Sequence, residues 1–205
     1  MTVESLVWTV VATVVTSIGG GVVLWHVGAA SRRYGLLLIG SVAVVAACTT
    51  AWPQALWPAA VPLGAFGLPA AVVDLVEHRI PNQASAMFVV SEAAGITGIA
   101  CVSETPEMLF RAAVGGLGWG GLLLVSFVVS GQPGPGDVKL VPSLGMLAGA
   151  AGWSAIGTAI ALCYLLAGCA ALALVVSGRR QARIPLAPAM VGGTVLAVTM
   201  TSLAA

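Results

Sequence analysis

The chain has 205 residues, of which 59% are hydrophobic and only 7% are charged, and its formal net charge is +1. Soluble domains carry about 25% charged residues, so this composition excludes an ordinary soluble protein and indicates a membrane protein with several spans. The near-neutral charge and the lack of basic clusters interleaved with aromatic residues give no support for nucleic-acid binding.

Long apolar runs predict helices here, because backbone polar groups in lipid must be satisfied within their own segment. We therefore expect an all-α, polytopic membrane protein with about seven or eight transmembrane or membrane-embedded helices. The run at 139–151 is short for a full crossing, since about 13 residues span only about 20 Å. The eight apolar runs cover residues 6–28, 35–51, 58–76, 83–102, 108–130, 139–151, 153–177 and 186–203.

The basic residues predict an orientation, because Lys and Arg collect in cytoplasmic loops. Arginines follow the first run, at positions 32 and 33, and precede the last run, at positions 179, 180 and 183. With both loops cytoplasmic, the eight-segment arrangement places Asp74 and Asp137 at the cytoplasmic ends of their helices. We expect a multi-pass protein of the inner (cytoplasmic) membrane with its site facing the cytoplasm.

Two short polar islands interrupt the apolar sequence and hold both aspartates of the chain, its one lysine and its one asparagine. The first island reads Asp74-Leu-Val-Glu-His-Arg-Ile-Pro-Asn82, and the second reads Gly134-Pro-Gly-Asp-Val-Lys-Leu140. An ionisable residue at membrane depth costs roughly 2.5–3.5 kcal/mol and is a functional candidate for that reason. We expect the two aspartates to work as a pair.

A pair of carboxylates has a specific chemistry when the two groups lie close together. Both cannot ionise cheaply, so the pair shares a proton. One aspartate can then activate water as a base, while the other protonates the carbonyl oxygen or the leaving amine. This is the arrangement of an aspartic protease. A structural or ion-coupling pair is the alternative interpretation of Asp74 and Asp137.

Neighbouring residues in the islands are candidates for shaping this site. Gly134 and Gly136 allow unusual dihedral angles and close backbone approach, so we expect a turn on which a substrate strand lies while Asp137 points into the site. Pro81 suits the first turn of a helix. Asn82 is expected to cap that helix or to orient a neighbouring carboxylate.

Other polar or small residues have more than one interpretation. Lys139 either balances charge at the site or meets lipid phosphates, and Glu92, in the middle of an apolar run, has either a structural or a site role. His78 is interpreted as a solvated interfacial side chain rather than a metal ligand. The glycine run 115–121 indicates close helix packing rather than a phosphate loop. The four cysteines form no Cys-x-x-Cys pair, and we expect them to be buried small apolar side chains.

The islands resemble two motifs of the type IV prepilin peptidases. The first is similar to the Asp…Arg-Ile-Pro-Asn motif of that family, and the second is similar to its Gly-x-Gly-Asp-x-Lys motif. A third stretch, Ile184-Pro-Leu-Ala-Pro188, resembles the Ile-Pro-Phe-Gly-Pro segment that opens the last helix of the family, with Leu-Ala in place of Phe-Gly. We accordingly divide one membrane domain into N-terminal helices without a motif, 1–57, and a peptidase-like core, 58–205.

The resemblance implies a membrane-embedded aspartic endopeptidase that removes the leader of prepilin-like proteins, cutting after a glycine at the cytoplasmic face. Asp74 and Asp137 would be the catalytic pair, and Gly134 and Gly136 would shape the loop before Asp137. Longer members carry an insertion with paired Cys-x-x-Cys zinc ligands and methylate the new N-terminus. That insertion is absent here, so we expect no methyltransferase activity, no metal and no cofactor.

The expected partners are prepilin-like substrates and the lipid bilayer. Three other functions are compatible with the same residues. The chain could belong to the broader group of intramembrane aspartyl proteases, which share Gly-x-Gly-Asp, although Lys139 and the Ile-Pro-Asn run favour the prepilin branch. It could be a small transporter or pilus-assembly factor with a proton-coupling aspartate pair. It could also be an inactive scaffold, against which the intact aspartate pair argues.

Overall fold

The computed structural model describes residues 39, 43, 46, 50–178 and 184–204. This part of the chain is all-helical and contains no strand, in agreement with the predicted fold class. The predicted run 6–28 lies outside the described residues, and so does most of the predicted run 35–51. The elements are η1 (Gln54–Leu56), α3 (Trp57–Pro62), η2 (Leu63–Gly67), α4 (Leu68–Glu77), α5 (Asn82–Val102), α6 (Pro106–Ser130), α7 (Pro135–Ala151), α8 (Trp153–Val176) and α9 (Ala187–Ala204).

Within the described residues, five helical stretches are long and apolar enough to cross a membrane, which makes this a membrane protein. The predicted count of seven or eight helices is not confirmed by them. With 17 residues, α7 is shorter than these five stretches. The five are Gln54–Glu77, Asn82–Val102, Pro106–Ser130, Trp153–Val176 and Ala187–Ala204.

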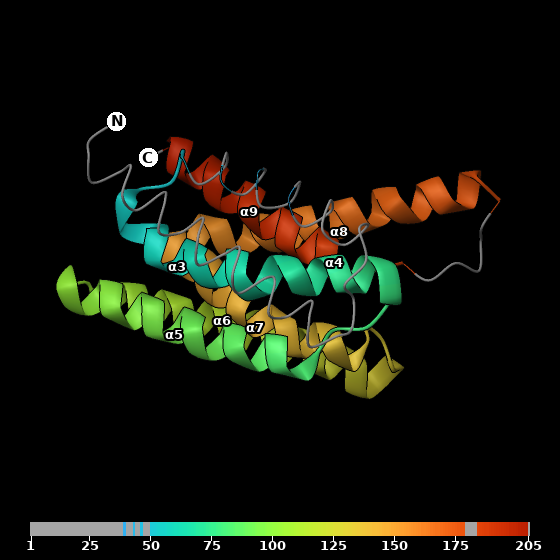
Figure 1. The fold of residues 1–205 in the computed structure, drawn as a ribbon, viewed down its shortest axis with the longest axis horizontal. Coiled ribbons are helices and arrows are strands. Elements are labelled where there is room, and N and C mark those ends of the chain that lie inside the picture. Colours follow the sequence, from blue (N-terminus) through green and yellow to red (C-terminus); the bar gives the residue numbers. More distant parts are fainter. Residues whose placement is uncertain (1–38, 40–42, 44–45, 47–49, 179–183, 205) are drawn as a thin grey trace.

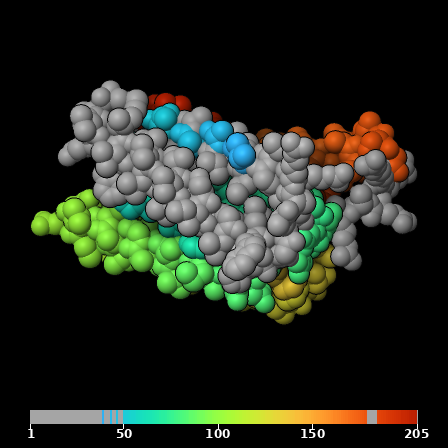
Figure 2. Space-filling model, in the orientation of Figure 1, coloured from blue at the N-terminus to red at the C-terminus, as the bar shows by residue number. Residues whose placement is uncertain are grey.

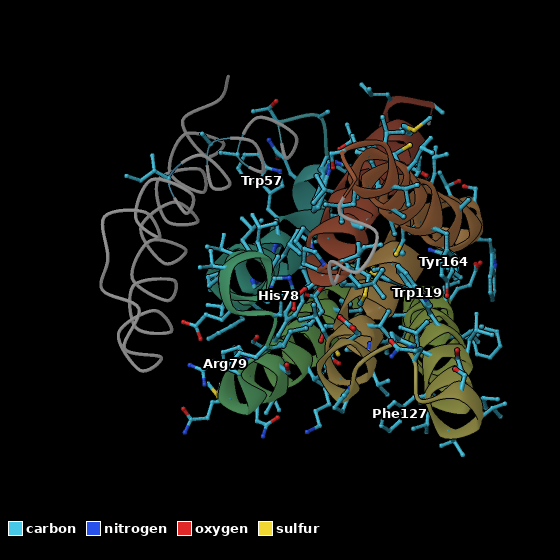
Figure 3. The ribbon with its side chains drawn as sticks, turned by 90° about the vertical axis from the view of Figure 1, so that its right-hand side faces the viewer. Trp57, His78, Arg79, Trp119, Phe127 and Tyr164 are labelled. Carbon is cyan, nitrogen blue, oxygen red and sulfur yellow. The ribbon has the colours of Figure 1, made fainter. Side chains whose placement is uncertain are left out.

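The helices run side by side along the long axis of the molecule (Figure 1). The closest pairs are α6 with α7 and α8 with α9, and α7 also packs on α5 and α9. Consequently α7 is the central helix, and most side chains in its middle are buried. Figure 3, which looks nearly along the bundle, shows side chains filling the spaces between the helices.

One end of α8 extends beyond the neighbouring helices, as Figures 1 and 2 show. Leu172 and Val176 in this part are 64% and 80% exposed, as expected for a helix that faces lipid. Cys163 of α8 is buried, but Cys169 of α8 and Cys101 of α5 are exposed. The expectation of burial was therefore wrong for those two cysteines, because a small apolar side chain can face lipid as readily as a protein core.

The glycines of α6 explain how closely it approaches α7. A Cβ atom added at Gly115 would overlap the backbone oxygen of Gly145, and one added at Gly149 would overlap the backbone oxygen of Arg111. Small residues at such positions let membrane helices approach until their backbones touch. The interpretation of the glycine run as a packing surface is confirmed for Gly115, Gly116 and Gly120, whereas Gly118 and Gly121 have open space around them.

The first span of the described part is interrupted. It begins with η1 and α3 and passes through the π-helical turn η2, which directly follows Pro62, before it continues as α4. Proline has no N–H for the helical ladder, and π-helical turns occur frequently at functional sites. This span packs closely on α5, since a Cβ at Gly67 would lie 2.9 Å from the ring of Phe88. The packing on α5 and α9 fixes α4, and with it Asp74.

Candidate active site

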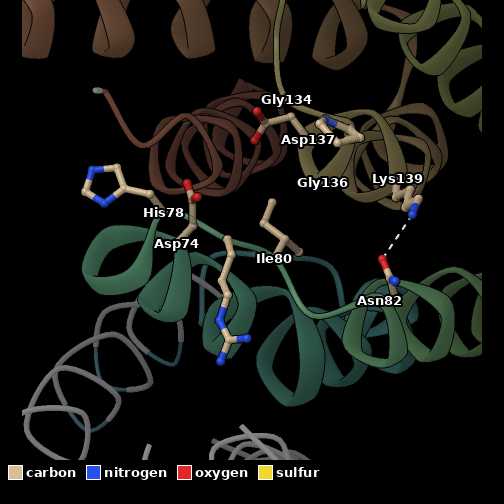
Figure 4. A pocket seen from close by; sticks show the side chains of 10 residues that line it. Asp74, His78, Ile80, Asn82, Gly134, Gly136, Asp137 and Lys139 are labelled. Carbon is tan, nitrogen blue, oxygen red and sulfur yellow. Dashed lines mark hydrogen bonds between the residues drawn. The ribbon is translucent and has the colours of Figure 1, made fainter. Parts of the chain in front are cut away.

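The two polar islands meet at one end of the bundle, where they line a pocket of about 240 Å³. Asp74 reaches this pocket from α4 and Asp137 from α7, and both carboxylates point into the space between the two helices (Figure 4). Six of the seven residues selected from the sequence line the pocket, and Pro81 does not. The lining residues are Asp74, His78, Arg79, Ile80, Asn82, Gly134, Pro135, Gly136, Asp137 and Lys139.

Asp74 lies in the last turns of α4 and is only 7% exposed. Its Oδ2 atom accepts a hydrogen bond of 3.1 Å from the backbone N–H of Ala187, the first residue of α9. The first N–H groups of a helix lack partners within the helix and carry a partial positive charge. The amino end of α9 therefore stabilises the carboxylate of Asp74.

Asp137 lies in the first turn of α7, where the helix dipole favours an acidic residue. Its side chain is partly buried, and its Oδ1 atom has no hydrogen-bond partner among the described residues. Burial and, to a smaller extent, the negative charge of Asp74 raise the pKa of Asp137 to about 6, against the opposing effect of a backbone hydrogen bond from Gly134. Asp137 is therefore suited to hold a proton next to Asp74.

The two glycines before Asp137 differ in whether their surroundings require glycine. Gly134 precedes α7 with φ −62° and ψ 157°, values that most residues can adopt, so the expectation of unusual dihedral angles was wrong. The helix begins at Pro135, four residues earlier than the predicted run, because proline fits the first helical position. Gly136 is different, since a Cβ there would lie 3.0 Å from the Cβ of Ile80. Close approach is thus required at Gly136.

The polar residues at the start of α5 also differ from expectation. Pro81 precedes the helix in an extended conformation instead of occupying its first turn, and no side chain caps this end of α5. The Oδ1 atom of Asn82 accepts a hydrogen bond of 3.0 Å from Nζ of Lys139 (Figure 4). Asn82 therefore joins α5 to α7 and neither caps α5 nor binds a carboxylate.

Two further basic side chains border the pocket. His78 ends α4 in the left-handed region, with φ 52°, and its side chain is exposed. Arg79 is also exposed and forms an ion pair with Glu77. Arg79 and Lys139 therefore place positive charge beside a pocket that contains two carboxyl groups.

Glu92 lies outside the pocket, in the middle of α5, and is completely buried. Neither of its carboxyl oxygens has a hydrogen-bond partner among the described residues. Leaving a buried polar group without a partner costs about 1–3 kcal/mol. The structure therefore separates Glu92 from the aspartate pair.

Sequence reasoning missed two contributors to this arrangement. Ala187 acts through its backbone N–H, which no side-chain pattern reveals, although the Ile-Pro-Leu-Ala-Pro stretch around it was noted as a motif. Ile80 contributes because its side chain lies against Gly136, directly before Asp137. Among the described residues, no group of three His, Cys, Asp or Glu side chains lies close enough to hold a metal ion.

Comparison with protein-family models, curated proteins and solved structures finds no match to this chain. The chemistry of the site is therefore argued from its own geometry. A charge-stabilised carboxylate opposite a partly buried carboxyl of raised pKa is an arrangement that can move one proton between a bound water and a substrate.

Proposed function

We propose that the chain is a membrane aspartic endopeptidase that removes the leader of prepilin-like proteins. The observation that supports this most directly is that both aspartates of the chain, far apart in the sequence, line one pocket. The resemblance of the three motifs to those of type IV prepilin peptidases supports the choice of substrate.

In the proposed reaction, one aspartate takes a proton from water as the water oxygen attacks the scissile carbonyl carbon. The other aspartate gives its proton to the carbonyl oxygen, and a tetrahedral intermediate forms. This intermediate collapses when the C–N bond breaks: the aspartate that took the proton from water gives it to the leaving amine, and the other aspartate takes back a hydroxyl proton as the new carboxyl group forms. We assign the proton donor to Asp137, because its unpartnered oxygen and raised pKa favour the protonated form.

The substrate in this proposal has a polar leader that ends in glycine, followed by an apolar helix. The helix would lie in the bilayer beside the bundle, and the leader would enter the pocket at its end. The new N-terminus would remain unmethylated, since the chain lacks the Cys-x-x-Cys insertion of the longer enzymes.

The test is co-expression with a candidate precursor from the same genome, followed by mass spectrometry of the precursor's N-terminus. Wild type is expected to give a cut after the leader glycine and an unmethylated product. Asp74→Asn and Asp137→Asn are expected to insert and fold but to leave the precursor intact. Glu107→Gln is the matched control, because Glu107 pairs with Arg111 away from the pocket. Cleavage by Asp137→Asn would refute the proposal.

A further inference from the structure

The two helices that carry the aspartates are held together mainly through other elements. α4 packs on α9, and α7 packs on α5, α6 and α9, whereas α4 and α7 make few direct contacts. The separation between Asp74 and Asp137 is therefore set by the packing of both helices on α9, together with the contacts that join α7 to the segment that follows α4. Two contacts in the described residues do this.

The first contact is between Ile80 and Gly136. Ile80 lies in the turn between α4 and α5, and Gly136 directly precedes Asp137. A Cβ added at Gly136 would lie 3.0 Å from Cβ and 3.2 Å from Cγ1 of Ile80, so the turn touches the backbone of α7. Figure 4 shows Ile80 in the space between α4, which carries Asp74, and α7, which carries Asp137.

The second contact is the 3.0 Å hydrogen bond from Nζ of Lys139 to Oδ1 of Asn82. Asn82 begins α5 just after the same turn, and Lys139 is two residues beyond Asp137. The partner of Lys139 is a neutral amide, and the ion pairs of the described residues do not include this lysine. The bond thus fixes the lysine in place without neutralising its charge.

From these contacts we propose that Ile80, Asn82, Gly136 and Lys139 form a clamp that sets the separation of the two aspartates. Its two members on α7, Gly136 and Lys139, lie before and after Asp137 in the sequence. Its members are positioning residues, and the inference rests on the proposed function of the aspartates. A misplacement of about 1 Å at a reacting group can cost about 100-fold in rate, so the clamp would act on turnover.

The separation of the aspartates can be measured without any substrate. The four native cysteines are replaced by alanine, Asp74→Cys and Asp137→Cys are introduced, and thiol-reactive cross-linkers of two lengths are added to membranes. We expect Asn82→Ala or Lys139→Met to lower the rate of bridging by the shorter reagent at least about fivefold. Glu107→Ala, far from the pocket, is the control. Unchanged bridging in both clamp variants would overturn the inference.

Kinetics on the cleaved precursor provide the second readout. Asn82→Ala, Lys139→Met and the double variant are each expected to lower kcat about 10- to 100-fold with little change in KM. The double variant should be no worse than either single variant, because both remove the same bond. Lys139→Arg, which can still donate to Asn82, should recover most of kcat.

The outcomes separate the inference from the proposed function. If Lys139→Met raises KM while Asn82→Ala has no effect, Lys139 binds substrate directly and the clamp is overturned. If the variants melt earlier but keep wild-type kcat and bridging rate, their role is only structural and the clamp is again overturned. If wild type cleaves no precursor, the proposed function fails, and the cross-linking result still decides whether the clamp exists.

Discussion

Ala187 donates its backbone N–H to Oδ2 of Asp74 at 3.1 Å, across 113 positions of the sequence. This bond links the third sequence motif to the first, and it is buried. The start of the last helix is therefore part of the site, even though its side chains carry no charge.

The N–H of Ala187 can be removed without interrupting α9. Ala187 is the first residue of the helix, where proline is tolerated because this N–H has no partner within the helix. Ala187→Pro is expected to lower cleavage about 10- to 100-fold, as a hydrogen bond to a charged group contributes about 1.5–3 kcal/mol. Ala187→Gly keeps the N–H and serves as the control. Equal activity of the two variants, measured by precursor cleavage, would contradict this role.

The pKa of Asp137 should depend on Asp74. In wild type it is raised to about 6, first by burial and then by the charge of Asp74. Asp74→Asn removes that charge, so the pKa of Asp137 should fall below 6 but stay above 3.8, since burial remains. Infrared titration of the carboxyl C=O band, assigned by its loss in Asp137→Asn, measures this shift. An unchanged midpoint would mean that the two groups do not interact.

The same raised pKa has a consequence for stability. The folded protein holds the proton of Asp137 more tightly than the unfolded chain does, so this group stabilises the fold most below pH about 4. Its contribution is lost as the pH rises through about 6. Thermal unfolding in detergent between pH 4 and pH 7 should therefore show a loss of stability that is absent in Asp137→Asn.

Glu92 is expected to reduce the stability of the bundle. Both of its oxygens lack hydrogen-bond partners among the described residues, and replacing such a group by an apolar side chain is usually neutral or stabilising. Glu92→Leu should unfold at the same or a higher denaturant concentration than wild type and should keep cleavage activity, with Glu92→Gln as the isosteric control. Loss of cleavage in both variants would instead give Glu92 a role in the reaction.

The contact of α6 with α7 should tolerate no side chain at Gly145. A methyl group there would overlap the backbone oxygen of Gly115, and overpacking of this kind costs typically 1–3 kcal/mol. Gly118 lies on the same α6 helix with open space around it, so Gly118→Ala should be neutral or slightly stabilising. Chemical unfolding of both variants in detergent measures the difference, and equal stability would contradict the close approach.

The membrane orientation can be tested by cysteine labelling in a chain without its native cysteines. Gln83 and Gln132 are exposed near the pocket end of the bundle, and Glu104 is exposed in the turn between α5 and α6. Gln83→Cys and Gln132→Cys should react from the cytoplasmic side, and Glu104→Cys should react from the opposite side. Labelling of Gln83→Cys and Gln132→Cys from different sides would rule out a site shared by both aspartates.

Much of the helix pattern could be predicted from the sequence, since long apolar runs have few alternatives in lipid. The predicted runs 83–102 and 153–177 differ by one residue at an end from α5 and α8. Hydrophobicity alone predicts the start of α7 too late, because the helix begins within the polar island, where Pro135 and Asp137 both suit a first helical turn. Boundaries that depend on such residues are decided by local backbone geometry rather than by hydrophobicity.

Sequence reasoning identified the residues of the pocket better than their contacts. The sparse charges of the chain made Asp74 and Asp137 conspicuous, and both line the pocket. The role of Asn82 could not be predicted, because its partner Lys139 is 57 positions away and local capping is the usual role of asparagine at a helix start. The part of Ala187 could not be predicted either, since every residue except proline has the backbone N–H that it uses.

The glycine contacts between α6 and α7 give this chain a recognisable sequence pattern that does not involve the aspartates. Gly115 faces Gly145, and Gly149 faces the backbone of Arg111, so these positions have no room for a side chain. A descendant that lost its aspartates but kept this pair of helices would still need glycine there. A search pattern built on the spacing of these glycines would therefore recover relatives without the aspartates that a pattern built on the aspartates would miss.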